Sequence, residues 1–168
     1  MSLDFNADEI FEIACQIERN GADFYQQMSE KISHDPTRKM LVEFVAMEKA
    51  HENVFKAMRK ELSAGEKGKT VFDPDEETLA YLHAMADIHV FDTEAEDDFT
   101  LSDDLGEAAK ARKILRAAIN REWGSIALYL GMKELVPDNL GREKIDGIIK
   151  EEMRHVNLLT RSLTGLKG

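Results

Sequence analysis

Two short motifs in this sequence place a glutamate and a histidine three residues apart. Glu48-Lys-Ala-His51 lies in one long periodic stretch, and Glu152-Met-Arg-His155 lies in another. Residues at i and i+3 share one face of a helix, and here that face is otherwise apolar. Carboxylate oxygens and imidazole nitrogens are ligands of divalent metals. The two motifs therefore indicate a metal-binding function.

Both motifs belong to an internal repeat. One offset, 104 positions, relates five pairs of residues: Glu18 and Glu122, Tyr25 and Tyr129, Glu48 and Glu152, His51 and His155, and Asn53 and Asn157. A constant offset across separate positions is hard to obtain by accident. We interpret the chain as two related helical hairpins arranged around a pseudo-two-fold axis.

The elements that must position these residues are predicted to be helices. Apolar residues recur at alternating steps of three and four, which is typical of bundle helices. Four long helices are expected, over about 7–32, 36–63, 102 or 105 to 135, and 138–163, with Asn6 as the first N-cap. A shorter helix is expected over about 75–90, followed by an acidic, irregular stretch.

The predicted fold is all-α, a four-helix bundle within a single domain over 1–168. Hairpin 1 covers about 7–63, the crossover about 64–104, and hairpin 2 about 105–163. The pseudo-two-fold axis makes the second and third long helices run in the same direction. The crossover must therefore travel the length of the bundle, which explains its size.

The repeat brings four carboxylates and two imidazoles to the middle of this bundle. Each ionised carboxylate in an apolar interior costs several kcal/mol of desolvation. Protons could neutralise the group, but two divalent cations would balance four negative charges. Iron or manganese suits oxygen-rich ligation with one imidazole per metal, and zinc is a further candidate. Bridging roles are expected for Glu48 and Glu152, and terminal roles for Glu18 and Glu122.

One glutamate on each of two helices and Glu-x-x-His on each of the other two is the arrangement of ferritin-like di-metal bundles. The sequence resembles the rubrerythrin-like branch of that superfamily. The resemblance rests on 17–25 (IERNGADFY), 47–51 (MEKAH), 121–129 (REWGSIALY) and 150–155 (KEEMRH). It implies two iron ions per chain, reduction of hydrogen peroxide and a homodimer. It also implies six metal ligands: Glu18, Glu48, His51, Glu122, Glu152 and His155.

Two features depart from that family. Rubrerythrins carry a second domain whose iron is held by four cysteines, whereas this sequence has only Cys15. Electrons are therefore expected from an external donor such as a rubredoxin-like protein. Rubrerythrins also commonly carry an extra glutamate one turn after the third-helix ligand, where this sequence has Ser125.

Residues beside the ligands leave alternatives open. Tyr25 and Tyr129 are either core aromatics with satisfied hydroxyls or donors to a ligand carboxylate. Glu151 is expected to be exposed, with a supporting role at the metal site as the alternative. Cys15 is expected to be a buried small hydrophobe. No catalytic residue is predicted beyond the ligands themselves.

Composition excludes other functions. The chain has 33 Asp and Glu against 22 Lys and Arg, for a formal net charge of −11. This excess argues against binding nucleic acid or an anionic membrane surface, and no apolar run approaches the length of a bilayer. The first residues are acidic where a secretory signal would be basic, so we expect a cytoplasmic protein.

Three functions fit the sequence. The leading hypothesis is a non-haem di-iron oxidoreductase that reduces peroxide or dioxygen. The second is a ferroxidase or other iron-handling protein, which a large shell would favour and a dimer would not. The third is a di-metal binding protein without turnover, in which the metal serves only to stabilise the fold.

Overall fold

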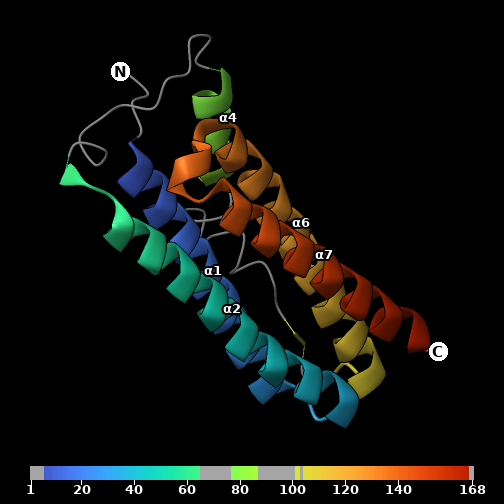
Figure 1. Ribbon diagram of the computed structural model, residues 1–168. Helices are drawn as coiled ribbons and strands as arrows, with labels where there is room; N and C mark the ends of the chain where they lie inside the picture. Colours follow the sequence, from blue (N-terminus) through green and yellow to red (C-terminus); the bar gives the residue numbers. More distant parts are fainter. Residues whose placement is uncertain (1–5, 65–76, 87–100, 103, 167–168) are drawn as a thin grey trace.

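The fold is a bundle of four long helices, seen in a computed structural model that describes residues 6–64, 77–86, 101–102 and 104–166. The long helices are α1 (Ala7–Lys31), α2 (Asp35–Glu61), α6 (Glu107–Leu135) and α7 (Arg142–Gly165). α1 packs on α2, and α6 on α7, as two hairpins. α2 and α6 run in the same direction, as predicted, and α1 and α7 run in the opposite one (Figure 1).

The first hairpin begins with the predicted capping signals. The Asn6 side chain accepts a hydrogen bond from the backbone N–H of Glu9, while the Glu9 carboxylate accepts one from the backbone N–H of Asn6. This capping box satisfies two donors that an uncapped helix would leave unpaired. Pro36 lies in the first turn of α2, where a missing N–H costs nothing.

Both helices of the second hairpin begin later than predicted. α6 starts at Glu107 because Gly106, its N-cap, is extended. The predicted start of the last helix at Asp138 is wrong, because a short 3₁₀ helix, Asp138–Leu140, comes first. Gly141 then adopts a φ of 101°, a left-handed conformation that interrupts the helical path and favours glycine. α7 therefore begins at Arg142.

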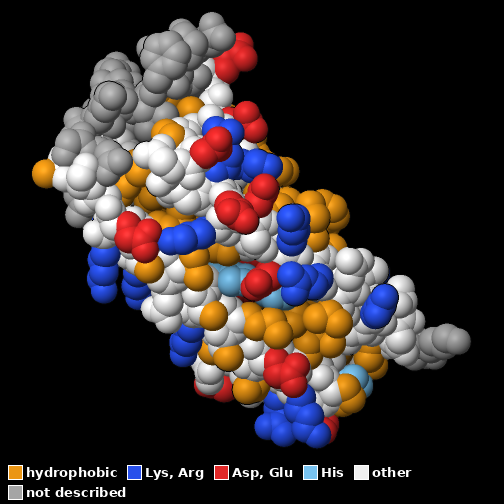
Figure 2. Space-filling model, in the orientation of Figure 1, with side chains coloured by type: hydrophobic (Ala, Val, Ile, Leu, Met, Phe, Trp, Pro, Cys, Tyr) orange, Lys and Arg blue, Asp and Glu red, His pale blue; other side chains and the backbone are white. Residues whose placement is uncertain are grey.

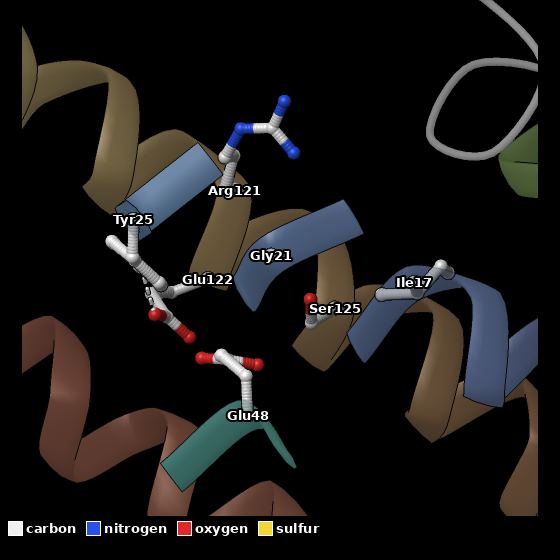
Figure 3. Close-up of a pocket in the computed structure, with 7 residues that line it drawn as sticks. All are labelled: Ile17, Gly21, Tyr25, Glu48, Arg121, Glu122 and Ser125. Carbon is white, nitrogen blue, oxygen red and sulfur yellow. Dashed lines mark hydrogen bonds between the residues drawn. The ribbon is translucent and has the colours of Figure 1, made fainter. Parts of the chain in front are cut away.

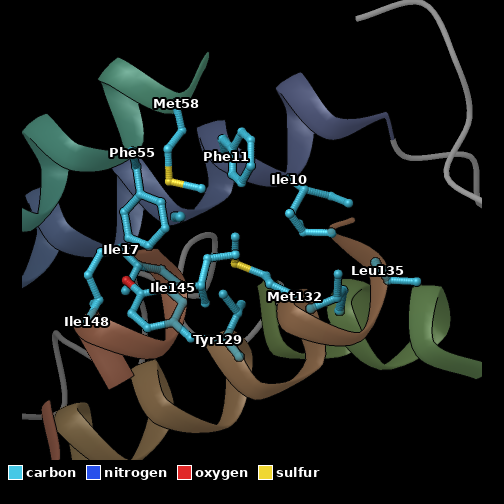
Figure 4. Close-up of a cluster of buried hydrophobic side chains, with 14 of the residues drawn as sticks. Ile10, Phe11, Ile17, Phe55, Met58, Tyr129, Met132, Leu135, Ile145 and Ile148 are labelled. Carbon is cyan, nitrogen blue, oxygen red and sulfur yellow. The ribbon is translucent and has the colours of Figure 1, made fainter. Parts of the chain in front are cut away.

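Two apolar clusters fill the bundle, one towards each end. One lies between the start of α1, the end of α2, the end of α6 and the start of α7, and Figure 4 shows its side chains meeting between the helices. The other lies at the opposite end and includes Phe44, Leu115 and Leu159. The predicted chemical residues occupy the layer between these clusters.

The crossover contributes a short helix, α4 (Glu77–Ala86), which packs against α6. The Tyr81 hydroxyl donates to the backbone oxygen of Ala127 at 2.8 Å. The Tyr81 ring lies against Gly131, where a Cβ would come within 2.8 Å of ring carbons. The remainder of the predicted helix, and the acidic stretch from 92 to 98, lie outside the described residues. None of the described helices has the length and apolar character needed to cross a bilayer.

Candidate metal centre

All six predicted ligands lie together in the middle layer of the bundle. Each helix supplies its share: Glu18 comes from α1, Glu48 and His51 from α2, Glu122 from α6, and Glu152 and His155 from α7. Every one of them is buried, at 5% exposure or less. They form two overlapping groups that each fit one metal ion, and within each group the ligand atoms lie within 4.8 Å of one another.

The two groups share two glutamates. Glu48 and Glu152 belong to both groups, whereas each of the other four residues belongs to one. The two carboxylate oxygens of Glu152 face different imidazoles. Oε1 lies 3.0 Å from Nδ1 of His51, and Oε2 lies 2.8 Å from Nδ1 of His155. Glu152 thus lies between the halves of the site, as a bridging ligand would.

The terminal positions follow the same pattern. Nδ1 of His51 lies 3.4 Å from Oε2 of Glu18, and Nδ1 of His155 lies 3.5 Å from Oε2 of Glu122. The two imidazole rings are stacked, with centroids 5.7 Å apart and planes 19° apart. Each half therefore contains one imidazole and one glutamate of its own.

Two buried tyrosines hold the terminal glutamates across the bundle. The Tyr25 hydroxyl donates to Glu122, and the Tyr129 hydroxyl donates to Glu18, so each tyrosine contacts the other hairpin. Burial first, and then the neighbouring carboxylates, raise the pKa of both tyrosines well above the usual value. Each therefore stays protonated and remains a donor. The hydroxyls are thus satisfied in the core, and their partners are two of the predicted ligands.

Burial and crowding also raise the pKa of two carboxyls. For Glu48, desolvation and then the charges of Glu18 and Glu152 raise the pKa well above its ordinary range. For Glu122, desolvation and the charge of Glu152 raise the pKa to about 8. Without a cation, both groups therefore keep their protons to a higher pH than an ordinary glutamate does. A metal ion would replace those protons.

For Glu152 and the two imidazoles, the neighbouring groups shift the pKa against the effect of burial. Burial alone would raise the pKa of Glu152, but His155 and His51 on either side lower it. Burial likewise opposes the charged imidazoles, yet the adjacent carboxylates raise the pKa of His51 to about 11 and that of His155 to about 9. The negative charge of this layer is therefore offset partly by protons on carboxyl groups and partly by the two imidazoles.

Five buried atoms of this layer are placed as metal ligands would be. Buried polar atoms are nearly always hydrogen-bonded, but five atoms in this layer have ion-pair contacts with one another and no regular hydrogen bond: Glu18 Oε2, His51 Nδ1, Glu152 Oε1, Glu152 Oε2 and His155 Nδ1. All five are atoms that donate a lone pair to a metal. They also face one another, so two cations between them would satisfy every one.

A small, partly open pocket reaches this layer between α1 and α6. Glu48 and Glu122 point towards one another at its inner end (Figure 3). Gly21 and Ser125 lie on its walls, and the repeat relates them because they are 104 positions apart. A Cβ on Gly21 would come within 3.2 Å of Oε2 of Glu48. The absence of a side chain at Gly21 therefore leaves room beside Glu48.

Comparison with known proteins supports the fold. No family model and no curated protein matches this sequence. A solved structure from Thermotoga maritima, provisionally described as a ferritin-like diiron-carboxylate protein, matches with a TM-score of 0.67 and 20% identity. The match covers 98% of each chain. The fold is ferritin-like.

Within this ferritin-like fold, Glu151 combines the expected exposure with a contact to a predicted ligand. Glu151 was expected to be exposed, and its side chain is 48% exposed, but its Oε2 lies 2.8 Å from Nε2 of His51. Glu151 adjoins a ligand in the sequence, which was the only signal of its contact. Cys15 is buried, as expected, and burial followed by the charge of Glu52 raises its pKa to about 11. The thiol is therefore protonated and unreactive.

Proposed function

We propose that the protein is a non-haem di-iron oxidoreductase. The observation that carries the proposal is the pair of overlapping buried groups that share Glu48 and Glu152. Glu18 and His51 would complete the ligands of one iron ion, and Glu122 and His155 those of the other. Manganese or zinc could occupy the same oxygen-rich sites.

Two iron ions bound in these groups would supply two electrons for the reduction of hydrogen peroxide or dioxygen. The protein's own contribution is to hold the ligands and exclude bulk water. Tyr25 and Tyr129 fix the orientation of the terminal glutamates and keep their protons. Glu48 and Glu122 carry protons when no cation is bound, and they would lose them on metal binding.

The pocket beside Gly21 and Ser125 supports access by a small oxidant. It reaches the carboxylates of Glu48 and Glu122 directly, and its small walls leave room for a molecule of a few atoms. Cys15 is a buried, protonated thiol and does not serve as a redox partner. We therefore propose that the electrons come from an external donor, such as a rubredoxin-like protein.

The test is redox chemistry of the iron-loaded protein. Protein loaded anaerobically with two Fe²⁺ per chain is mixed with one equivalent of hydrogen peroxide, and the near-ultraviolet absorption of ferric iron is followed. We expect rapid oxidation of both ions, and further turnover when a chemical reductant is supplied. Absence of oxidation would overturn the proposal and leave a metal that only stabilises the fold.

The same experiment separates the iron-handling alternative. A ferroxidase would oxidise added Fe²⁺ far beyond two ions per chain and retain or release the ferric product. Gel filtration gives an independent criterion, because iron storage needs a large shell. We propose a homodimer, and elution at that size would exclude a storage shell.

A further inference from the structure

His51 and His155 both point Nδ1 at the buried carboxylates, but the surroundings of their Nε2 atoms differ. Nε2 of His51 lies 2.8 Å from Oε2 of Glu151, which reaches it from α7. Over the part of the chain that the structure describes, the ion pairs of His155 all involve Nδ1 and none involves Nε2. Its ring packs instead against Phe44, with centroids 4.6 Å apart.

The internal repeat shows where this difference comes from. Glu152 and Glu48 are 104 positions apart, and so are Glu151 and Met47, the residues that precede them. Met47 thus occupies in the first hairpin the place from which Glu151 reaches His51 in the second. Met47 is partly buried against the apolar cluster around Phe44 and Leu41. A thioether is uncharged and only a weak acceptor, so it cannot do for His155 what Glu151 does for His51.

A carboxylate at this place has a defined chemical effect. An ionised carboxylate only accepts hydrogen bonds, so Nε2 of His51 must carry the hydrogen. Nδ1, which faces Glu18 and Glu152, is then the atom that donates its lone pair to a metal ion. The hydrogen bond also fixes the ring and makes the imidazole a stronger donor. Removal of such a partner typically lowers metal affinity about 10-fold to 100-fold.

We propose that Glu151 is a positioning residue that makes the His51 half of the centre bind metal more tightly than the His155 half. The two metal ions then bind in order, first with Glu18 and His51 and second with Glu122 and His155. This inference rests on the proposed di-metal site. It adds that the two halves differ in metal affinity, which the sequence repeat alone would not suggest.

The contact between Glu151 and His51 lies close to the protein surface. The Glu151 side chain is 48% exposed, whereas that of His51 is 3% exposed. Figure 2 shows histidine atoms with acidic and basic side chains beside them in the middle of the face drawn. The contact therefore forms at the edge of the buried layer. Replacing Glu151 takes away one hydrogen bond without opening a cavity in either apolar cluster, so Glu151→Gln should fold.

Anaerobic titration of the metal-free protein with Co²⁺ tests the proposal. Co²⁺ is stable under these conditions, its visible absorption reports its ligands, and calorimetry gives the two affinities. We expect two steps that differ by about 10-fold to 100-fold. Glu151→Gln should weaken the tighter step towards the other, and Met47→Glu should strengthen the weaker step. Glu143→Gln, which removes the same charge elsewhere on α7, should change neither.

A double-mutant cycle shows whether Glu151 acts through His51. Glu151→Gln should cause no further loss of affinity in a His51→Ala background and the full loss in a His155→Ala background. Thermal unfolding of each metal-free variant checks the fold. Equal affinities in the wild type, or equal losses in both backgrounds, would overturn the inference while leaving the di-metal site intact. Failure of the wild type to bind any Co²⁺ would overturn both.

Discussion

Glu48 and Glu52 lie one turn apart on α2, and both are buried, but their neighbours carry opposite charges. Glu52 lies 2.9 Å from Nη2 of Arg19 and 2.7 Å from Nζ of Lys56, and these cations hold its pKa below the ordinary value against the effect of burial. Glu48 faces three other carboxylates, and its pKa is raised. The protein supplies side-chain cations where a carboxylate is structural. In the middle layer it supplies mainly carboxylates and imidazoles, and the one nearby cation among the described residues is Arg121 on the pocket wall, whose charge acts on Glu122 and Glu48.

The two glutamates therefore differ in the source of the positive charge that neutralises them. A buried charge that keeps its own cation is satisfied and contributes modestly to stability. A buried group of carboxylates with unpaired oxygens remains unstable until protons or metal ions arrive. Variants of Glu152 and of Glu52 should therefore behave differently.

The largest expected effect is loss of both metals on removal of a shared glutamate. Glu152→Ala removes the ligand that belongs to both groups, so bound metal should fall from two ions per chain to none. Glu52→Ala should keep two, because Glu52 belongs to neither group. Metal content after gel filtration is measured by mass spectrometry. Retention of two ions by Glu152→Ala would contradict the shared role.

Raising the pH should destabilise the metal-free protein. The raised pKa values of Glu122, about 8, His155, about 9, and His51, about 11, mean that the metal-free folded state holds more protons than the unfolded state. This stabilisation is complete below the unfolded pKa values and is lost as pH rises through the folded ones. The metal-free protein should therefore become less stable from pH 6 to 9.

Metal should reverse that trend, because deprotonated ligands bind it better. At 100 times the Kd, bound metal stabilises by about 2.7 kcal/mol, or roughly 5–10 °C in Tm. Calorimetric scans with and without Mn²⁺ should show this gain growing with pH. A gain that shrinks towards pH 9 would show that protons and metal do not compete in this layer.

A smaller effect is expected from the tyrosines. Tyr129→Phe removes the hydroxyl that donates to Glu18 and should weaken metal binding about 10-fold or more. Tyr81→Phe is the matched control, because its hydroxyl donates to a backbone oxygen away from the centre. Titration with Co²⁺ measures both. Equal behaviour of the two variants would mean that Tyr129 only fills the core.

The smallest effect is expected at Glu52. Its lowered pKa contributes stability above the unfolded value of about 4.5, and this contribution is lost as pH falls through the folded value. Glu52→Gln should cost about 1 kcal/mol or less at pH 7 and nothing in strong acid. Urea unfolding at several pH values measures this. A cost that grows as pH falls would contradict the ion pair with Arg19 and Lys56.

Much of this fold could be predicted because its signals are periodic. The alternation of apolar residues predicted the long helices, and the repeated offset predicted that α2 and α6 are parallel. The same offset predicted that the six glutamates and histidines meet in one layer, where the structure brings them together. Their role as ligands stays a prediction, as does the division of the chain into hairpins and crossover within one domain.

Other features lie beyond sequence periodicity. The late start of α7 depends on the left-handed conformation of Gly141, which only the tertiary path of the chain requires. The contact of Glu151 with His51 spans two helices, and the place of Glu151 beside Glu152 is its only sign in the sequence. The ion pair of Glu52 with Arg19 likewise joins α2 to α1. Spacing along one helix does not show which side chains a neighbouring helix presents.

Metal stoichiometry tests the central claim most directly. The metal-free protein is incubated anaerobically with excess Fe²⁺, freed of unbound metal by gel filtration, and analysed for iron per chain. Two overlapping groups of buried ligands predict two iron ions per chain. A value of one would contradict the pair of sites, and a value of zero would show that the buried carboxylates are neutralised by protons alone.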